Sequence, residues 1–209
     1  MASSGTRRRR PARPVDRFDE RRDQLAESAL VTLGTLGYAR SSLREIAQNS
    51  PFSHGVVHYY FEDKLDLVVY SVRYYKARCV TRYDAVVAES TSPHELVERF
   101  AEKLAQTIRE EAPMHRLWYD LRTQSMFEPQ LCEAVVLIDR TLQEMIWRVV
   151  TRYGELADRD LAVGPAVAYG MLDGLFQQAL MAYGDDGEPA VDALAESVGA
   201  VMPLLLFQE

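Results

Sequence analysis

Apolar side chains recur at intervals of three and four residues along most of the chain, which is the period of an α-helix. Leu25, Ala29, Leu33 and Leu36 form one such row, and similar rows continue almost to the C-terminus. Very little of the chain alternates apolar and polar residues in the way that a half-buried strand does. The pattern therefore predicts an all-α protein with about nine helices and no sheet.

Glycine, proline and capping residues divide the front of the chain into three helices. Gly37 stops the first helix, and Ser42 can cap a short helix, "LREIAQN", with Glu45 completing a capping box. After Pro51, Ser53 can cap a third helix, "HGVVHYYF". Two short helices joined by a tight turn form a helix-turn-helix, which places its second helix in the major groove of DNA.

The helices that follow are longer. Apolar spacing and proline positions predict these elements: one helix over about 65–88, one that begins at Ser92, a short one after Pro113, a long one after Pro129, and two at about 160–183 and 189–207. The segment "GDDGEP" separates the last two.

The second helix of the helix-turn-helix has two distinct faces. Val57, Phe61 and the preceding Phe52 are expected to face inward, against Leu33, Leu36, Ile46 and Ala47. The outward face is then made by His54, Val56, His58 and Tyr59. Imidazole and phenol groups can form hydrogen bonds with phosphates and base edges, and Gly55 lets the backbone approach a duplex closely.

The two histidines, four residues apart, have other interpretations. They share one helix face, as metal-binding pairs do, and Glu62 could add a third ligand. A metalloprotease helix, however, needs Glu directly after its first His, where this chain has Gly55. The pair could also be part of a solvated surface without a partner. A DNA-facing surface is the interpretation we favour, and no metal or other cofactor is predicted.

Charge is divided unevenly along the chain. Residues 1–64 hold eleven Lys or Arg and eight Asp or Glu, a net +3, whereas residues 65–209 hold thirteen and twenty-three, a net −10. A basic front can meet a polyanion that an acidic rear would repel. We predict a disordered basic arm over residues 1–16, a helix-turn-helix DNA-binding domain over 17–64 and a larger helical domain over 65–209.

The segment "SSLREIAQNSPFSHGVVHYYFEDKLDLV" resembles the DNA-binding domain of the tetracycline-repressor (TetR/AcrR) family of bacterial transcriptional regulators. The similarity runs from Leu25 to Tyr70, and it departs from the family pattern at Pro51, Val56 and His58. The resemblance implies contacts with a double-stranded DNA operator. The candidate DNA-binding residues are Ser42, Arg44, Ser53, His54, Gly55, Val56, His58, Tyr59, Tyr60 and Lys64.

The resemblance also implies that residues 65–209 bind an effector and form a homodimer. Ala166, Gly170 and Gly174 are a row of small residues that would let helices approach closely. A second row contains Val191, Leu194, Val198, Val201 and Leu205. We expect the last two helices of each chain to form a four-helix interface, the alternative being that they pack only within one chain.

Aromatic and polar residues of the rear domain predict a site for a small, mainly apolar or aromatic effector, and Arg122 near Trp118 and Tyr119 would allow it one anionic group. The candidates are Trp118, Tyr119, Arg122, Trp147, Asp173 and Gln177. For any single one of these residues, a place in the ordinary core is the favoured alternative. Arg122 and Asp173 need a partner or a ligand if they lie among apolar neighbours, and they could instead make structural pairs.

Other classes of protein fit the sequence less well. It has no phosphate-binding glycine-rich loop, no nucleophile elbow, no secretory signal and no apolar run of the ~18 residues that a membrane span needs. Cys79 and Cys132 form no disulfide framework, which suits the cytoplasm. We predict a cytoplasmic, homodimeric, ligand-responsive repressor and not an enzyme. The alternatives are a helical cytoplasmic enzyme and a non-specific DNA-binding protein.

Overall fold

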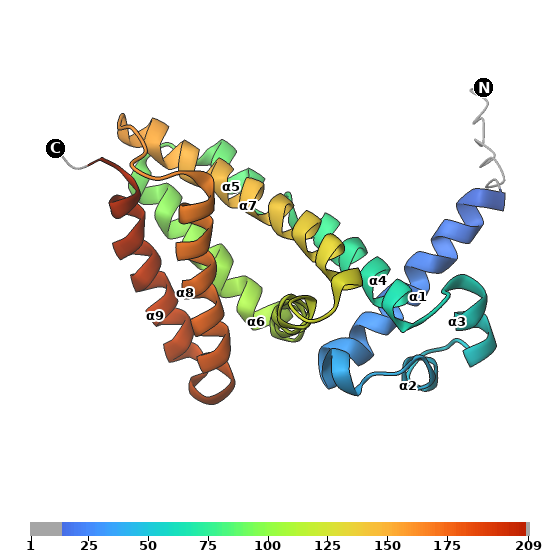
Figure 1. Ribbon diagram of the computed structural model, residues 1–209. Helices are drawn as coiled ribbons and strands as arrows, with labels where there is room; N and C mark the ends of the chain where they lie inside the picture. Colours follow the sequence, from blue (N-terminus) through green and yellow to red (C-terminus); the bar gives the residue numbers. More distant parts are fainter. Residues whose placement is uncertain (1–13, 208–209) are drawn as a thin grey trace, which may run out of the picture.

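The computed structural model describes residues 14–207, with side chains from residue 17. Over this range the chain forms nine α-helices and a final 3-10 turn, and it has no strand beyond one isolated bridge between Leu161 and Leu206 (Figure 1). The helices are α1 (Pro14–Arg40), α2 (Leu43–Gln48), α3 (His54–Tyr60), α4 (Lys64–Cys79), α5 (Asp84–Glu89), α6 (Pro93–Ser125), α7 (Pro129–Ala157), α8 (Pro165–Asp186) and α9 (Glu188–Val201). The predicted all-α fold of about nine helices is confirmed.

The first three helices and the last two helices lie at opposite ends of the molecule (Figure 1). Helices α1, α2 and α3 form one end, α8 and α9 form the other, and α4, α6 and α7 lie between them. The buried apolar side chains form one continuous cluster from α1 to the C-terminal turn. Helix α4 packs on both α1 and α7, so it joins the first end to the middle of the molecule.

The predicted caps of the short helices are confirmed. The Ser42 hydroxyl accepts a hydrogen bond from the Glu45 N–H at 3.2 Å, and the Ser53 hydroxyl accepts one from the Val56 N–H at 3.4 Å. Gly37 has a φ of 77°, which suits glycine and interrupts the helical backbone of α1 before Arg40. Most of the predicted arm, residues 1–13, lies outside the described residues, and α1 already begins at Pro14.

The single helix predicted over residues 65–88 is wrong, because a turn at residues 80–83 separates α4 from α5. Two side chains of this turn are held by α6. The Arg82 guanidinium donates to the Thr107 hydroxyl at 2.9 Å and to the Glu111 carboxylate at 2.6 Å. The buried Tyr83 ring lies 5.0 Å from the ring centre of Phe100. These contacts with a distant part of the chain stabilise a bend that the apolar spacing does not reveal.

The short helix predicted after Pro113 is instead the second half of α6. Glu111 leaves helical geometry, with φ −130° and ψ 19°, and the helix continues after this kink to Ser125. Proline lacks an N–H, and its ring crowds the carbonyl four residues earlier, so it kinks the helix without ending it here.

The start of α8 and the end of α9 also differ from the prediction. Helix α8 begins at Pro165, since the segment before it is held against the C-terminal turn: Leu161 forms a bridge with Leu206, and the Ala162 N–H donates to the Leu205 carbonyl at 2.8 Å. Helix α9 ends at Val201 and passes into the 3-10 turn. Between residues 14 and 207, no helix combines the length and apolar character needed to cross a lipid bilayer.

Candidate nucleic-acid interface and ligand cavity

Helix α3 is oriented by its buried face. Val57 and Phe61 are 0% and 1% exposed, and Phe52 is also buried, as predicted. Of the residues expected beneath them, Leu33, Ile46 and Ala47 are buried, whereas Leu36 is half-buried. The apolar anchors fix the rotation of α3 about its axis and thereby decide which side chains face away from the protein.

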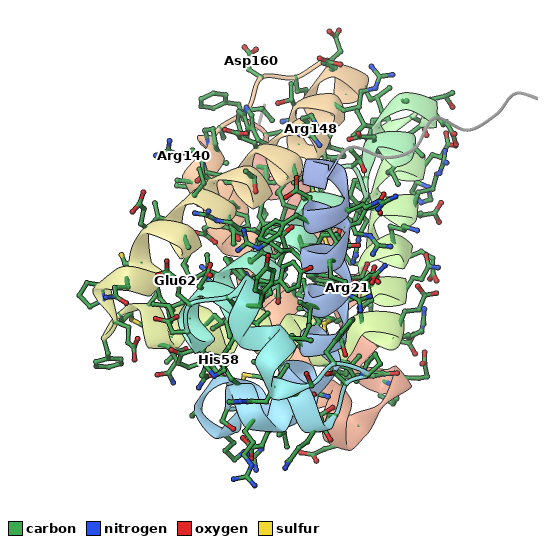
Figure 2. All side chains as sticks on the ribbon, turned by 90° about the vertical axis from the view of Figure 1, so that its right-hand side faces the viewer. Arg21, His58, Glu62, Arg140, Arg148 and Asp160 are labelled. Atoms are coloured by element: carbon green, nitrogen blue, oxygen red, sulfur yellow. The ribbon has the colours of Figure 1, made fainter. Side chains whose placement is uncertain are left out.

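The surface opposite these anchors carries the candidate contact residues of α3. His54, His58 and Tyr59 are exposed, Tyr59 to 73%. Gly55 is exposed as well, and a side chain at this position would meet nothing within 4 Å. Figure 2 faces this end of the molecule, with His58 on the helix surface toward the viewer. The outward orientation expected of Val56 is wrong, because Val56 is half-buried against the core.

The two histidines lie against each other. The ring centres of His54 and His58 are 4.4 Å apart in an edge-to-face arrangement. Within the described part of the chain, no group of three or more His, Cys, Asp or Glu side chains could hold a metal ion, so Glu62 does not complete a site with them. The pair presents imidazole nitrogens at a surface, which is chemistry suited to hydrogen bonding.

Arg44 extends the candidate surface onto α2. It is exposed, and together with Gln48, Ser53 and His54 it lines a groove between α2 and α3. Ser42 and Ser53 are exposed, but their hydroxyl oxygens already accept the capping hydrogen bonds. Arg21 of α1 was missed by the sequence reasoning: its guanidinium lies over the ring of Phe52, two residues before α3, at 4.7 Å from the ring centre. Figure 2 shows Arg21 on α1.

Two of the candidate DNA-binding residues, Lys64 and Tyr60, already make contacts within the protein. The Lys64 ammonium donates to the Tyr38 carbonyl at 2.5 Å and lies 4.0 Å from the Tyr38 ring centre. Burial lowers the pKa of Lys64. Tyr60 is half-buried, with its ring centre 4.8 Å from that of Phe18. Lys64 therefore joins the start of α4 to the end of α1, and two of its three donor hydrogens are left for another acceptor.

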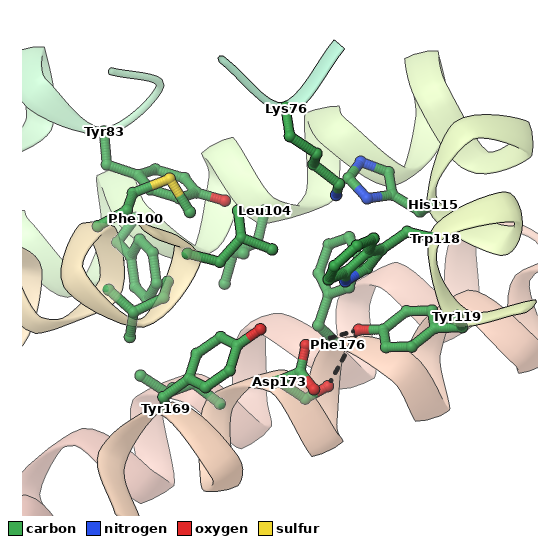
Figure 3. A pocket seen from close by; sticks show the side chains of 14 residues that line it. Lys76, Tyr83, Phe100, Leu104, His115, Trp118, Tyr119, Tyr169, Asp173 and Phe176 are labelled. Atoms are coloured by element: carbon green, nitrogen blue, oxygen red, sulfur yellow. Dashed lines mark hydrogen bonds between the residues drawn. The ribbon is translucent and has the colours of Figure 1, made fainter. Parts of the chain in front are cut away.

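A second candidate site lies inside the rear half of the protein (Figure 3). It is a cavity of about 70 Å³ between α4, α6, α7 and α8. Its wall is mainly apolar and aromatic, with a few ionisable groups. The lining residues are Lys76, Tyr83, Phe100, Leu104, His115, Trp118, Tyr119, Leu142, Met145, Ile146, Tyr169, Leu172, Asp173 and Phe176.

The structure divides the six predicted effector residues into two groups. Trp118, Tyr119 and Asp173 line the cavity, whereas Arg122, Trp147 and Gln177 do not. The structure therefore places this second group outside the cavity wall, and a role for these three residues in effector binding stays a prediction. Trp147 packs partly buried against the apolar core, which is what most aromatic residues of a helical domain do.

Arg122 and Asp173 pair with each other. The Arg122 guanidinium donates to one oxygen of Asp173 at 2.6 Å, and the Tyr119 hydroxyl donates to the other oxygen at 2.9 Å. Burial raises the pKa of Tyr119, and the neighbouring Asp173 raises it further, so Tyr119 remains a hydroxyl donor. Both oxygens of this carboxylate are thus satisfied within the protein.

Lys76 and His115 are the cavity residues of greatest chemical interest that the candidate list missed. Lys76 is 4% exposed, and burial lowers its pKa to about 8. Burial lowers the pKa of His115 well below its ordinary value, and the nearby Lys76 and Arg82 lower it further. One signal in the sequence could have found Lys76: it continues, at intervals of four, the buried row of Val68 and Val72.

No family model matches the chain. The chain is 23% identical over 169 residues to the HTH-type transcriptional regulator BetI of Yersinia pestis (strain Pestoides F), covering 77% of this chain and 81% of that protein. Among solved structures, a TetR transcription regulator from Haloarcula marismortui superposes with a TM-score of 0.73, at 19% identity, over 91% of this chain and 100% of that one. A transcriptional regulator from Saccharomonospora viridis in complex with choline also superposes with a TM-score of 0.73, at 17% identity and the same coverage.

These similarities define the class of fold. The chain is an all-helical protein with a helix-turn-helix at one end and a larger helical body behind it. Its fold is that of the TetR-family transcriptional regulators, and the resemblance seen between Leu25 and Tyr70 is confirmed at this level.

Proposed function

We propose that the protein is a homodimeric, DNA-binding transcriptional regulator of the TetR type, a repressor that a small molecule releases from its operator. The observation that carries the proposal is the orientation of α3. Val57 and Phe61 bury one side of a short, capped helix, and His54, His58 and Tyr59 project from the other. A recognition helix that enters the major groove needs this arrangement. In this proposal the protein binds DNA and a small molecule, catalyses no reaction and is located in the cytoplasm.

The proposed division of the chain follows the two ends of the molecule. Residues 17–64 would read DNA, the basic residues before them would meet phosphates, and residues 65–209 would bind the effector and the second subunit. Arg44 would read a base edge beside the contacts of α3. Ser42, Ser53, Tyr60 and Lys64 would contact the sugar-phosphate backbone, which positions the protein without reading sequence.

Replacing Arg44 with alanine should weaken operator binding by about 1–3 kcal/mol and relax base preference at one symmetric pair of positions. An arginine is well suited to two parallel hydrogen bonds with a guanine edge, and Arg44 is exposed on α2. The operator can be selected from a random DNA library, and fluorescence anisotropy on single-base variants then measures the effect. Arg140→Ala is the matched control, because Arg140 is exposed on α7 and its replacement removes the same charge. An equal loss on every sequence would reassign Arg44 to a phosphate contact.

The proposed subunit interface differs from the one that the sequence suggested. Val191, Leu194, Val198 and Leu205 are buried within their own chain and Val201 is half-buried, so we infer that this row does not face a second subunit. The row of small residues is more accessible, although its third member, Gly174, is half-buried. Ala166 and Gly170 are exposed, and Val167 between them is 54% exposed. A second copy of this chain would cover α8 through this row and bring two α3 helices onto one face of the duplex.

Gly170→Arg should convert the dimer to a monomer and abolish operator binding. A side chain at Gly170 meets nothing within 4 Å in a single chain, so the substitution should leave the subunit folded and obstruct only the partner. Sedimentation velocity checks the mass, and circular dichroism checks the helices. Val136→Arg on α7, at a position 52% exposed, is the matched control. A Gly170→Arg protein that remains dimeric would place the interface elsewhere.

The route from cavity to DNA runs through two helices. Helix α4 carries Lys76 at the cavity and, at its first residue, Lys64 bonded to Tyr38 of α1. The second half of α6 carries Trp118 at the cavity, and two residues later Asp120 accepts a hydrogen bond from the Tyr38 N–H at 2.7 Å. A ligand that moves either helix would shift the end of α1 and hence the spacing of the two α3 helices.

A further inference from the structure

Three polar groups at one end of the cavity lack a hydrogen bond within the part of the protein that the structure describes. The Nε2 of His115 and the Nε1 of Trp118 are buried without a hydrogen bond. The Nζ of Lys76 contacts aromatic rings, 4.9 Å from the Trp118 ring centre and 5.5 Å from that of Tyr75, and within residues 17–207 it forms no hydrogen bond or ion pair. Figure 3 shows these three side chains together, apart from Tyr83 and Phe100 at the other end. Buried polar groups are nearly always hydrogen-bonded, so two unpaired buried nitrogens beside a lysine ammonium around a single cavity indicate a built site.

The cavity wall carries an uncompensated positive charge. Lys76 is the cation, and the nearby carboxylates are already neutralised: Asp173 by Arg122 at 2.6 Å and Glu111 by Arg82 at 2.6 Å. His115 is neutral, because burial opposes its protonation. A charge enclosed in this way attracts an anion strongly, since little water is present to screen it.

The rest of the wall sets the shape of the ligand. Phe100, Leu104, Ile146 and Phe176 offer apolar contacts and no hydrogen bonds. A volume of about 70 Å³ holds on the order of five water molecules, so a ligand must be compact or must widen the cavity as it binds. We propose that the effector is a compact apolar molecule with one carboxylate, which Lys76 receives as an ammonium and to which the His115 and Trp118 N–H groups donate hydrogen bonds.

A quaternary ammonium ligand is the competing class, because aromatic rings such as Trp118, Tyr119 and Phe176 attract cations. Lys76 argues against it here. Its Nζ lies 4.9 Å from the Trp118 ring centre, so this protein's own cation already occupies the ring, and a second one would be repelled. This inference deepens the proposed function and rests on it in one respect, that the cavity is the effector site.

Calorimetric titration of the full-length protein at pH 7 tests the charge of the ligand. Three probes share one skeleton and differ in charge: phenylacetate, phenylacetamide and phenethylammonium. Isovalerate and benzoate serve as further carboxylates, and choline serves as the quaternary ammonium. We expect phenylacetate to bind at least tenfold more tightly than phenylacetamide, and both cations to fail to bind. Equal binding of acid and amide, tighter binding of either cation, or no binding by any of the three carboxylates would overturn the proposal.

The variant Lys76→Met tests the receiving group. It keeps the length of the side chain and removes the ammonium, so it should abolish the preference for phenylacetate over phenylacetamide while phenylacetamide binds as before. Lys103→Met is the matched control, since Lys103 lies outside the cavity wall on α6 and hydrogen-bonds Gln106 at 2.9 Å. A purely structural lysine would change both affinities together, and that result would contradict the assignment.

Operator binding in the presence of the same probes separates this inference from the proposed function. If carboxylates bind through Lys76 and leave operator affinity unchanged, the site stands and the ligand-responsive function fails. If an uncharged or cationic molecule releases the operator and Lys76→Met responds as the unaltered protein does, the function stands and the carboxylate site is wrong.

Discussion

Replacing His58 and Tyr59 together with alanine is expected to reduce operator affinity by roughly 100-fold or more, since base-edge contacts are lost in both half-sites of the operator. Thermal stability should hardly change. Both residues are exposed, and the Tyr59 ring makes only surface contacts with Phe18 and Tyr60. Substitutions at such positions change stability by about 0.5 kcal/mol or less.

Fluorescence anisotropy with the selected operator measures the loss of binding, and circular dichroism measures the melting temperature. His94→Ala is the matched control, because His94 is exposed on α6 and pairs with Glu98. A chelator should leave both the fold and operator binding intact. Unfolding or loss of binding on chelation would instead favour the metal interpretation of His54 and His58. Retained operator affinity in the double variant would remove α3 as the recognition helix.

Lys76→Met is expected to raise the free energy of unfolding at pH 7 by up to about 3 kcal/mol. The pKa of Lys76 falls from 10.5 to about 8, and each unit of difference between folded and unfolded states corresponds to about 1.4 kcal/mol. Burial is the principal cause of the lowered pKa, because it disfavours the charged form. Methionine has a similar length and carries no charge, so the variant removes the cost of a buried ammonium.

The sign of the pH dependence follows from the two pKa values. Below pH 8 both states hold the proton, and the folded protein bears the full cost of the buried charge. Between pH 8 and 10.5 the unfolded state binds more protons than the folded state, so the stability of the unaltered protein rises toward that of the variant. The other charged or titratable groups that act on Lys76 are Cys79, Arg82, Glu111, His115 and Asp173, and all are present in both proteins.

Urea unfolding at pH 7 and at pH 9.5 measures this difference. The advantage of Lys76→Met should be largest at pH 7 and smaller at pH 9.5, whereas Lys103→Met should change stability little at either pH. The prediction would be falsified if the advantage of Lys76→Met were equal at both values. A stabilised variant that has also lost its preference for carboxylates would show that the buried charge serves binding at the expense of stability.

The sequence by itself determined the front of the molecule. Capping joins residues only three positions apart, so Ser42 and Ser53 identified the starts of α2 and α3. Burial on a helix repeats every three to four residues, so the spacing of Val57 and Phe61 identified the inner face of α3 and, with it, the exposure of His58. Capping and helical spacing both depend only on residues within one short segment, so the sequence alone reveals them.

Features that join distant segments required the tertiary structure. The break after α4 is held by Arg82 on Glu111, and the α9 row around Val198 is buried by its own chain and not by a partner. Periodicity shows that a helix face is apolar, and it does not show what covers that face.

The ligand cavity was decided almost entirely by tertiary structure. Trp118 and Asp173 could be selected as polar or aromatic residues on apolar helices, but their selection together with Arg122 did not reveal that Arg122 neutralises Asp173. Lys76 is far in sequence from both Trp118 and Asp173. Its burial depends on the packing of α4, α6 and α8 around one cavity. A lysine in a helix is ordinarily solvated, and packing by neighbours far along the chain is what makes this one an unpaired, buried charge.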